Sequence, residues 1–372
     1  MHLSIRKLKS VLPKKVIMFG LNSCEHDISI ITACLMRTAE MIAIYIDKHN
    51  RWYATDHILT PAQFANVDKR MFIACTVLPN SNILYAIKRN RLYPLFSIEC
   101  ALLCFHGNNG EDGAIQGLLT LANIPYTGSN VLASSALMCK ITTKKLLSSH
   151  GYNIVDYITL DHNDSMEEIQ VKVAEFGYPV VIKPASLGSS IGITLVNQPT
   201  ALSSAVSLAL AYDNNIVVER ALSNYEEINC AVMRSGNAYV ISATEKPLKV
   251  GDIYTFGDKY LKDTKFNAFP TQSVDKKTAA KVKQITAKIA KDLNIGGVAR
   301  VDYLVVDSTI YVNEINTIPG SLAYHLFADK MTKQQFIDSL MEDALRYHKS
   351  RNALVHTYNS IVLNGNINLS KK

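Results

Sequence analysis

The pattern of hydrophobic and polar positions in the first third of the chain predicts alternating strands and helices. Residues 15–20, Lys-Val-Ile-Met-Phe-Gly, are an apolar run that ends in glycine, as expected for a buried first strand. Residues 27–43 carry apolar side chains at spacings of three and four, which predicts a helix. A second buried strand is expected at 101–105, and a helix at 112–123. Loops at the carboxyl ends of parallel strands bind ligands in open α/β sheets, so the loop after residue 105 is a candidate site.

The same periodicities continue through the rest of the chain. Two hairpins are expected, 227–233 with 238–243 and 298–306 with 309–314. The remaining expected elements are strands at 51–56, 82–86, 179–183, 193–196 and 216–219, and helices at 134–150, 165–176, 200–212, 276–293 and 333–347. This alternation predicts a mixed α/β (α+β) protein, and 372 residues suit two or three domains.

Composition narrows the function classes. The apolar fraction of 48% and charged fraction of 19% are typical of a folded soluble chain. The net charge of +7 comes from scattered lysines, and the densest cluster, 276–291, reads as the solvated face of an amphipathic helix, which argues against nucleic-acid binding. Seven cysteines without a CxxC pair favour thiols in a reducing cytoplasm, and no apolar run reaches the roughly 18 residues that a membrane span needs. We therefore expect a cytoplasmic protein with no nucleic-acid or membrane partner.

The loop at 106–113, His-Gly-Asn-Asn-Gly-Glu-Asp-Gly, is the first candidate for chemistry. Glycine-dense backbone is entropically costly to order, and it usually lets backbone approach a ligand. Taken alone, His106 after an apolar strand is about as compatible with a structural role as with a catalytic one. The glycines around it favour a ligand site.

A second glycine-rich turn follows the strand that ends at Lys183. Small residues at 185–192 leave backbone N–H groups available for phosphate oxygens, and the lysine supplies positive charge. Glycine turns between strands are common, so phosphate binding and a plain turn both remain open on these residues alone.

The second hairpin carries the residue types of a magnesium site. Glu314 and Asn316 lie two apart and so point to one face of a strand, while Asp302 lies on its expected partner. Carboxylate and amide oxygens suit Mg²⁺, which proteins commonly bind together with substrate phosphates. The alternative is a hairpin with solvent-facing polar residues.

These motifs, in this order, resemble the D-alanine–D-alanine ligases of the ATP-grasp superfamily. The resemblance rests on 19–29, 106–129, 183–192, 217–222 and 300–317. It implies a three-domain ATP-grasp architecture with an open parallel N-terminal sheet. The implied domains are an N-terminal domain at 1–130, a central domain at 131–218 and a C-terminal domain at 219–355, followed by a tail at 356–372.

The resemblance also implies a reaction and its residues. ATP would phosphorylate one D-alanine, and a second D-alanine would attack the acyl phosphate to give D-alanyl-D-alanine for peptidoglycan precursors. Mg²⁺, replaceable by Mn²⁺, would be held by Asp302, Glu314 and Asn316. The implied catalytic residues are Glu25, His106, Ser189, Tyr260, Arg300 and Gly320. The implied nucleotide contacts are Lys140, Lys183, Ser190, Ile191, Glu219, Arg220, Leu222, Glu227 and Lys259. Family members tend to dimerise, which implies a homodimer.

Three departures from the family pattern bear on these expectations. Leu21 stands where a second glycine is usual, and Cys139 replaces the aspartate of a Met-Asp-Lys motif. In the segment after Gly320, His325 and Leu326 occupy the positions of a serine–leucine pair that binds the acceptor carboxylate. We therefore expect an altered acceptor pocket, unless Ser321 or backbone groups do the same job. A ligase with another acceptor such as D-serine, and a nucleotide-binding paralogue with little activity, are the alternative functions.

Overall fold

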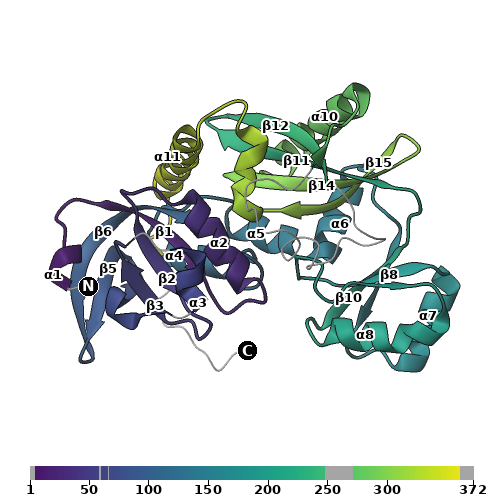
Figure 1. Ribbon diagram of the computed structural model, residues 1–372, viewed down its shortest axis with the longest axis horizontal. Helices are drawn as coiled ribbons and strands as arrows, with labels where there is room; N and C mark the ends of the chain where they lie inside the picture. Colours follow the sequence, from purple (N-terminus) through teal and green to yellow (C-terminus); the bar gives the residue numbers. More distant parts are fainter. Residues whose placement is uncertain (1–4, 58–59, 66, 248–270, 361–372) are drawn as a thin grey trace.

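The computed structural model describes residues 5–57, 60–65, 67–247 and 271–360, which form three β-sheets accompanied by helices (Figure 1). In Figure 1 the N-terminal sheet lies at the left, the central sheet at the lower right and the C-terminal sheet above them. The predicted mixed α/β fold is confirmed. Within the described ranges, no helix combines the length and apolarity that crossing a bilayer requires.

The N-terminal sheet closes on itself in the order β1 to β6, because β6 pairs back onto β1. Only the β1–β2 and β1–β6 pairings are parallel, and the other four are antiparallel. The strands are β1 (Lys14–Gly20), β2 (Ile42–Ile46), β3 (Trp52–Thr55), β4 (Ile73–Leu78), β5 (Ser81–Lys88) and β6 (Arg91–Leu103).

The expectation of an open parallel N-terminal sheet is therefore wrong. The physical reason lies in the turns between strands. Lys88 pairs with Arg91 across a two-residue turn, and both turn residues, Arg89 and Asn90, have left-handed φ angles of 51° and 59°. Such a turn joins only antiparallel neighbours, since a parallel crossover needs a dozen or more residues.

Helices α1 (Ile5–Leu8), α2 (His26–Met36), α3 (Pro61–Ala65) and α4 (Ala114–Leu121), with the short 3₁₀ turn η1 (Lys69–Met71), accompany this sheet. The helix expected at 27–43 begins near the predicted residue but ends at Met36, and the residues from Ile42 form β2. The Arg37 guanidinium donates to the carbonyls of Met41 and Thr55, which holds the chain as it turns from helix to strand.

The central sheet has the antiparallel order β7-β10-β8-β9. Helix α7, which follows β7, is capped by Ser165, whose hydroxyl accepts from the Glu168 N–H while the Glu168 carboxylate accepts from the Ser165 N–H. The elements are β7 (Tyr157–Asp161), α7 (Met166–Phe176), β8 (Val180–Pro184), β9 (Thr194–Val196), η2 (Pro199–Ala201), α8 (Leu202–Leu210) and β10 (Asn215–Arg220).

The single helix expected at 134–150 is two helices, α5 (Val131–Met138) and α6 (Lys140–Ser149). Cys139 separates them because its backbone is extended, with φ −82° and ψ 109°. The Lys140 N–H donates to the Ala185 carbonyl at 2.7 Å instead of to its own helix. This break directs the start of α6 at the loop that follows β8.

The C-terminal sheet has the antiparallel order β13-β12-β11-β14-β15, so both predicted hairpins are confirmed. Helix α10, a long amphipathic helix, covers one face and buries Val282 and Ile289 in the core of this sheet. The elements are β11 (Glu226–Ser235), β12 (Ala238–Pro247), β13 (Thr271–Gln272), α10 (Lys276–Asp292), β14 (Val298–Val306) and β15 (Thr309–Asn316).

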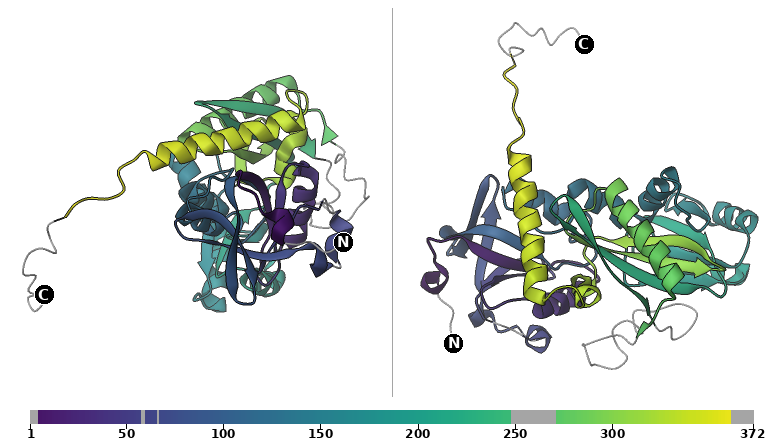
Figure 2. Two further views of the ribbon diagram at one scale, coloured as in Figure 1. Left: turned by 90° about the vertical axis from the view of Figure 1, so that its left-hand side faces the viewer. Right: turned by 90° about the horizontal axis from the view of Figure 1, so that it is seen from above.

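The chain then returns to the N-terminal sheet through η3 (Gly320–Phe327) and α11 (Lys333–Asn352). Phe327, Phe336 and Leu340 belong to the same buried cluster as Val16 and Leu102 of the first sheet. Figure 2 shows α11 as a long helix that lies across the molecule, with residues 353–360 leading away from its end. The C-terminal segment thus fixes the N-terminal domain against the C-terminal sheet.

Candidate active site

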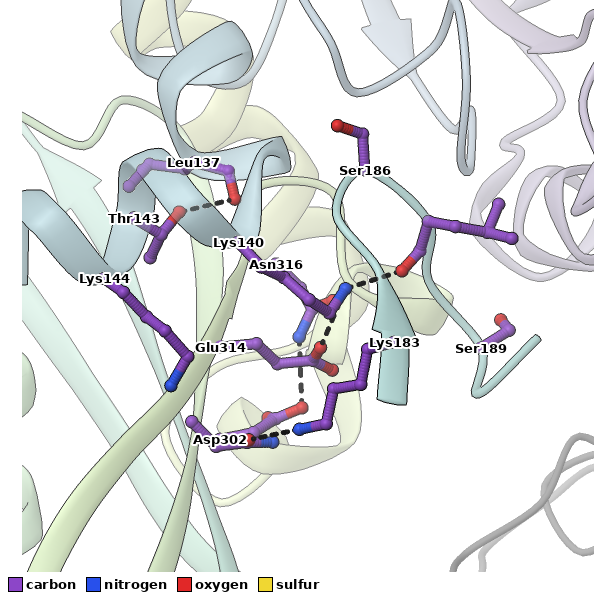
Figure 3. A network of polar contacts seen from close by, with 12 residues as sticks. Leu137, Lys140, Thr143, Lys144, Lys183, Ser186, Ser189, Asp302, Glu314 and Asn316 are labelled. Carbon is purple, nitrogen blue, oxygen red and sulfur yellow. Dashed lines mark hydrogen bonds and ion pairs between the residues drawn. The ribbon is translucent and has the colours of Figure 1, made fainter. Parts of the chain in front are cut away.

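A cleft with about 440 Å³ of space, open to solvent, lies where the three parts of the chain meet. Its lining comes from the glycine loop, helices α5 and α6, the loop after β8 and strand β15, and comprises Glu111, Leu137, Met138, Lys140, Thr143, Leu187, Gly188, Asn313, Glu314, Ile315, Asn316 and Thr317. Figure 3 shows Lys140, Lys183, Glu314 and Asn316 grouped at this position.

Lys140 spans the cleft from the start of α6. Its Nζ donates to the Leu187 carbonyl at 2.6 Å and lies 3.7 Å from Glu314 Oε2 (Figure 3). The break at Cys139 is what places this ammonium between the glycine turn and β15. A cation that already bridges these two elements suits an anionic ligand such as phosphate.

Lys183, at the end of β8, belongs to a buried ion network. Its Nζ donates to Glu219 Oε2 at 2.8 Å, while the other carboxylate oxygen of Glu219 lies 3.0 Å from Nζ of Lys144. Burial alone would raise the pKa of Glu219, but the two lysines outweigh it and lower that pKa. Burial lowers the pKa of Lys144, against the opposing effect of Glu219. Two ammonium groups on one carboxylate leave a net positive charge beside the cleft.

Asp302 and Glu314 are direct cross-strand partners on β14 and β15, as are Arg300 and Asn316. The Asn316 amide donates to Asp302 Oδ2 at 3.0 Å, so the structure brings the three expected metal ligands to one face. No cluster of three His, Cys, Asp or Glu side chains within the described ranges has the geometry of a metal site. The third ligand of this set is an amide, and two carboxylates with an amide oxygen fit Mg²⁺.

Arg300 holds Asp302 with two hydrogen bonds, from Nε at 2.6 Å and from the second guanidinium nitrogen at 2.7 Å. Burial alone would lower the pKa of Arg300, but Asp302 outweighs burial and the pKa rises. The guanidinium is therefore permanently charged and held in one orientation.

The turn after β8 is compact. Ser189 and Ser190 have left-handed φ angles of 52° and 57°, and the Ile191 N–H donates to the Gly188 carbonyl at 3.2 Å. A Cβ at Gly188 would lie 2.9 Å from Glu25 Oε2, so a larger residue there would require the Glu25 carboxylate to shift. The Ser189 hydroxyl donates to Glu25 Oε1, which joins the central domain to the N-terminal one. Tyr260 and Lys259, the other residues expected at this point, lie outside the described residues.

The glycine loop places Glu111 at the bottom of the cleft. Its carboxyl oxygens accept from the Gly107 N–H at 2.8 Å and from the Ile318 N–H at 3.2 Å. Burial and the nearby charge of Glu25 raise the pKa of Glu111 to about 8, against the opposing effect of the two backbone donors. Sequence reasoning named this loop but omitted Glu111 from the site.

His106, the first residue of this loop, has a buried and uncharged side chain. Its Nε2 lies 2.8 Å from the Thr32 hydroxyl, which also accepts from the Ser321 N–H at 3.1 Å. Burial, then the charge of Arg300, lower the pKa of His106 to about 3, and a hydrogen bond to the Ile318 backbone offsets them only in part. Thr32 thus joins both His106 and the segment after Gly320 to α2.

The segment after Gly320 has an unusual backbone. Ser321, Leu322 and Ala323 have left-handed φ angles of 49°, 51° and 52°, a conformation that costs non-glycine residues of order 1 kcal/mol or more each. Gly320 has an open position, since no atom lies within 4 Å of where its Cβ would be. His325 follows on the exposed side of η3 and Leu326 on its buried side.

The expected nucleotide contacts divide into two groups. Lys140, Lys183 and Glu219 lie at or beside the cleft, as described above. Arg220 points elsewhere, with its guanidinium 4.9 Å from the Phe176 ring and 3.9 Å from Asp156. Leu222 is half-buried in the link after β10, and Glu227 lies on β11 opposite Leu304.

Four residues absent from the expected set belong to the same networks: Thr32, Glu111, Lys144 and Glu245. Lys144 follows Lys140 by one helical turn, so helical spacing could have identified it. Thr32 and Glu245 gave no local signal, because their partners are far away in sequence.

Comparison with known proteins identifies the family. A family model described as D-ala D-ala ligase N-terminus matches residues 14–129, and one described as D-ala D-ala ligase C-terminus matches residues 146–342. The chain belongs to the D-alanine–D-alanine ligase family.

Similar sequences and structures extend over most of the chain. The D-alanine–D-alanine ligase of Thermosipho melanesiensis is 35% identical over 90% of this chain and 94% of its own length. D-alanine–D-alanine ligase A of Escherichia coli K12 is 31% identical over 92% of this chain and 98% of its own length. The structure of the D-alanine–D-alanine ligase from Coxiella burnetii has a TM-score of 0.76 at 28% identity, and covers 92% of this chain and 97% of that one.

Two departures from the family pattern now have a structural description. Leu21, at the usual glycine position, has a left-handed φ of 75° and is buried in the N-terminal core. Its backbone conformation is one that glycine adopts without strain. Cys139, at the usual aspartate position, starts α6 without a side-chain hydrogen bond to the helix.

Proposed function

We propose that this protein is an ATP-dependent ligase that joins two D-alanines into D-alanyl-D-alanine for peptidoglycan precursors. The observation that carries the proposal is one cleft lined by Lys140, Glu314 and Asn316, with Asp302 hydrogen-bonded to both Asn316 and Arg300. Cations and oxygen ligands gathered in this way are the groups that phosphoryl transfer requires. Two relatives that match this chain over nearly their whole length are named D-alanine–D-alanine ligases, which supports the same reaction.

The reaction has two chemical steps. The carboxylate of the first D-alanine attacks the γ-phosphorus of ATP, which gives D-alanyl phosphate and ADP. The amine of the second D-alanine then attacks the acyl carbon, and the tetrahedral species expels phosphate. On the side of the chain, Lys140 and Lys183 face the transferring phosphoryl group and Arg300 donates to the developing oxyanion. A solved ligase of this fold, from Bacillus anthracis, is complexed with ATP.

Mg²⁺, for which Mn²⁺ can substitute, would be held by Asp302, Glu314 and Asn316. Arg300 and Lys140 already compensate the two carboxylates, so the site tolerates its negative charge before the metal arrives. When bound, the metal would neutralise charge on the ATP phosphates.

The amino-acid side of the cleft is formed by the N-terminal domain. Glu25, fixed by Ser189, would bind the ammonium group of the first D-alanine, and His106 would support the wall beside it. The proposal includes the remaining expected roles. Tyr260 and Lys259 would belong to a lid, Ser190 and Ile191 would lie over the phosphates, and adenosine would be contacted by Arg220, Leu222 and Glu227. We also propose a cytoplasmic homodimer, which light scattering of the purified protein would test.

The direct test is a coupled assay of ADP release with product analysis by mass spectrometry. D-Alanine is expected to stimulate ADP release and to yield D-alanyl-D-alanine, whereas L-alanine is expected to do neither. A higher rate with D-alanine plus D-serine would show that the acceptor is D-serine and not D-alanine. Nucleotide binding without D-alanine-dependent ADP release would indicate the nucleotide-binding paralogue and overturn the proposal.

A further inference from the structure

A histidine and a glutamate form a hydrogen-bonded pair at the other end of the C-terminal sheet from Glu314. His325, on η3, has its Nε2 3.1 Å from Oε2 of Glu245 on β12. The histidine side chain is 46% exposed, whereas that of the glutamate is only 11% exposed. The pair therefore presents an accessible imidazole in front of a buried carboxylate.

The buried carboxylate is ionised and fixed in place. Burial alone would raise the pKa of Glu245, but its hydrogen bond and charge interaction with His325, followed by the charge of Arg300, lower it. The Asn229 amide also donates to Glu245 Oε1 at 3.4 Å. An ionised Glu245 accepts from Nε2–H of the ring, which leaves the lone pair of the neutral imidazole on Nδ1.

The pair faces the same side of the sheet as the reaction site. Glu245 is the cross-strand partner of Asn229, which is the partner of Asp302, which is the partner of Glu314. Positions paired in this way share a face, so one polar row runs from the histidine pair to the metal ligands, with neighbouring strands about 4.8 Å apart. The charge of Arg300, which holds Asp302 in this row, acts on both Glu245 and His106.

The second step of the proposed reaction needs a base. An amino acid carries its amine as an ammonium group near neutral pH, and an ammonium has no lone pair with which to attack an acyl carbon. A positioned imidazole backed by a carboxylate is a common solution to this need, because the carboxylate fixes the ring and stabilises the imidazolium that forms.

We propose that His325 is the general base that deprotonates the acceptor's ammonium group, and that Glu245 is the residue that positions it. This inference rests on the proposed ligase function. Nδ1 of His325 takes one proton, the freed lone pair forms the C–N bond, and the C–O bond to phosphate breaks. A second proton leaves the nitrogen as the amide forms and is carried off on phosphate, so that acyl phosphate and ammonium give amide, HPO₄²⁻ and one proton.

Two other roles fit the pair less well. As a mere attachment of η3 to β12 it would be weak, since half-exposed ion pairs contribute little to stability. As a binding site for the acceptor carboxylate it would place the negative charge of Glu245 directly behind the ring, and the Nδ1 lone pair would repel a carboxylate. A general base, by contrast, requires both the carboxylate behind the ring and the free lone pair on Nδ1.

The experiment separates the two chemical steps with hydroxylamine, which is uncharged at neutral pH and attacks acyl phosphates without prior deprotonation. Wild type, His325→Gln and Glu245→Gln are assayed with ATP and D-alanine, with and without hydroxylamine. Glutamine keeps a hydrogen-bonding side chain near the size of histidine but cannot take up the proton. We expect His325→Gln to lower kcat/KM for the acceptor about 100-fold, and Glu245→Gln about 10-fold, with D-alanine hydroxamate formation within about threefold of wild type in both.

The matched control is His150→Gln on the exposed end of α6, which should leave both reactions unchanged. Dipeptide synthesis by His325→Gln within about threefold of wild type would overturn the proposal. Equal loss of the dipeptide and hydroxamate reactions in both variants would also overturn it, since it would indicate a structural role. A wild-type enzyme that forms neither product would instead refute the proposed function, so the two failures are distinguishable.

Discussion

The two walls of the cleft stabilise their carboxylates in different ways. On the central and C-terminal side each carboxylate has a fixed cation: Glu219 has Lys144 and Lys183, Asp302 has Arg300, and Glu314 has Lys140. On the N-terminal side Glu111 is held by two backbone N–H groups, and Glu25 accepts from a serine hydroxyl.

This difference follows from what each wall would bind. A wall that receives a triphosphate needs surplus positive charge, and permanently charged lysines and arginines provide it. A wall that receives the ammonium group of an amino acid needs carboxylates, because their negative charge attracts the ammonium. On the N-terminal wall, burial and the nearby charge of Glu25 raise the pKa of Glu111 to about 8.

The largest effect on activity is expected from a substitution of Arg300, on the central and C-terminal side of the cleft. Lysine cannot reproduce the two hydrogen bonds that the guanidinium makes to Asp302. We expect Arg300→Lys to lower kcat by about 10²–10³-fold with a smaller change in the KM for ATP. Steady-state kinetics would show this, with Arg351→Lys at the end of α11 as a control. A decrease in kcat of less than about fivefold would show that the bidentate geometry is unimportant.

The next effect concerns the buried lysine of the same wall. Lys144→Met removes one of the two cations on Glu219, which then neutralises more of the charge of Lys183. We expect the Kd for ATP to rise about tenfold and the protein to lose about 1–3 kcal/mol of stability. Calorimetric titration and denaturant unfolding would measure both quantities. Exposed Lys145→Met is the neighbouring control, and an unchanged ATP affinity in Lys144→Met would contradict the role of Lys144.

On the N-terminal wall the expected effect is a pH dependence. The pKa of Glu111 rises from its ordinary value of 4.5 to about 8 on folding, so between these values the folded state binds more protons than the unfolded state. Stability attributable to Glu111 is therefore greatest below pH 4.5 and falls as the pH rises toward 8. Glu111→Gln is expected to be less stable than wild type by about 1–2 kcal/mol at low pH, because its amide meets a backbone donor. This gap should narrow as pH rises, and denaturant unfolding at several pH values would reveal a constant gap if the explanation is wrong.

The smallest effect is expected where α6 enters the cleft. Cys139 has the extended backbone of an N-cap but makes no side-chain hydrogen bond to the helix. Cys139→Asp is expected to stabilise the protein by about 1 kcal/mol, because aspartate accepts from the first-turn N–H groups. Denaturant unfolding beside Cys139→Ala would separate capping from the loss of the thiol. Equal stability of the two variants would refute the proposed capping effect of aspartate.

Some features could be read from the sequence because they are local. Periodicity predicted β1, both hairpins, and the helices α7 and α10, since these elements form from neighbours in the chain. Two-residue spacing predicted that Glu314 and Asn316 share a face. The prediction of a single helix at 134–150 was wrong because Cys139 adopts an extended backbone, which hydrophobic spacing does not encode.

The sequence by itself determined the residue types on the central and C-terminal side of the cleft, because lysines and carboxylates near strand ends follow short, regular patterns. Only the tertiary structure decided the contacts between distant segments, such as Glu111 with Ile318, 207 residues apart, and His325 with Glu245, 80 residues apart. Such contacts form when sheets and helices pack, and no periodicity within one segment specifies which distant residue will meet it. The closure of the N-terminal sheet was decided in the same way, when β6 paired with β1.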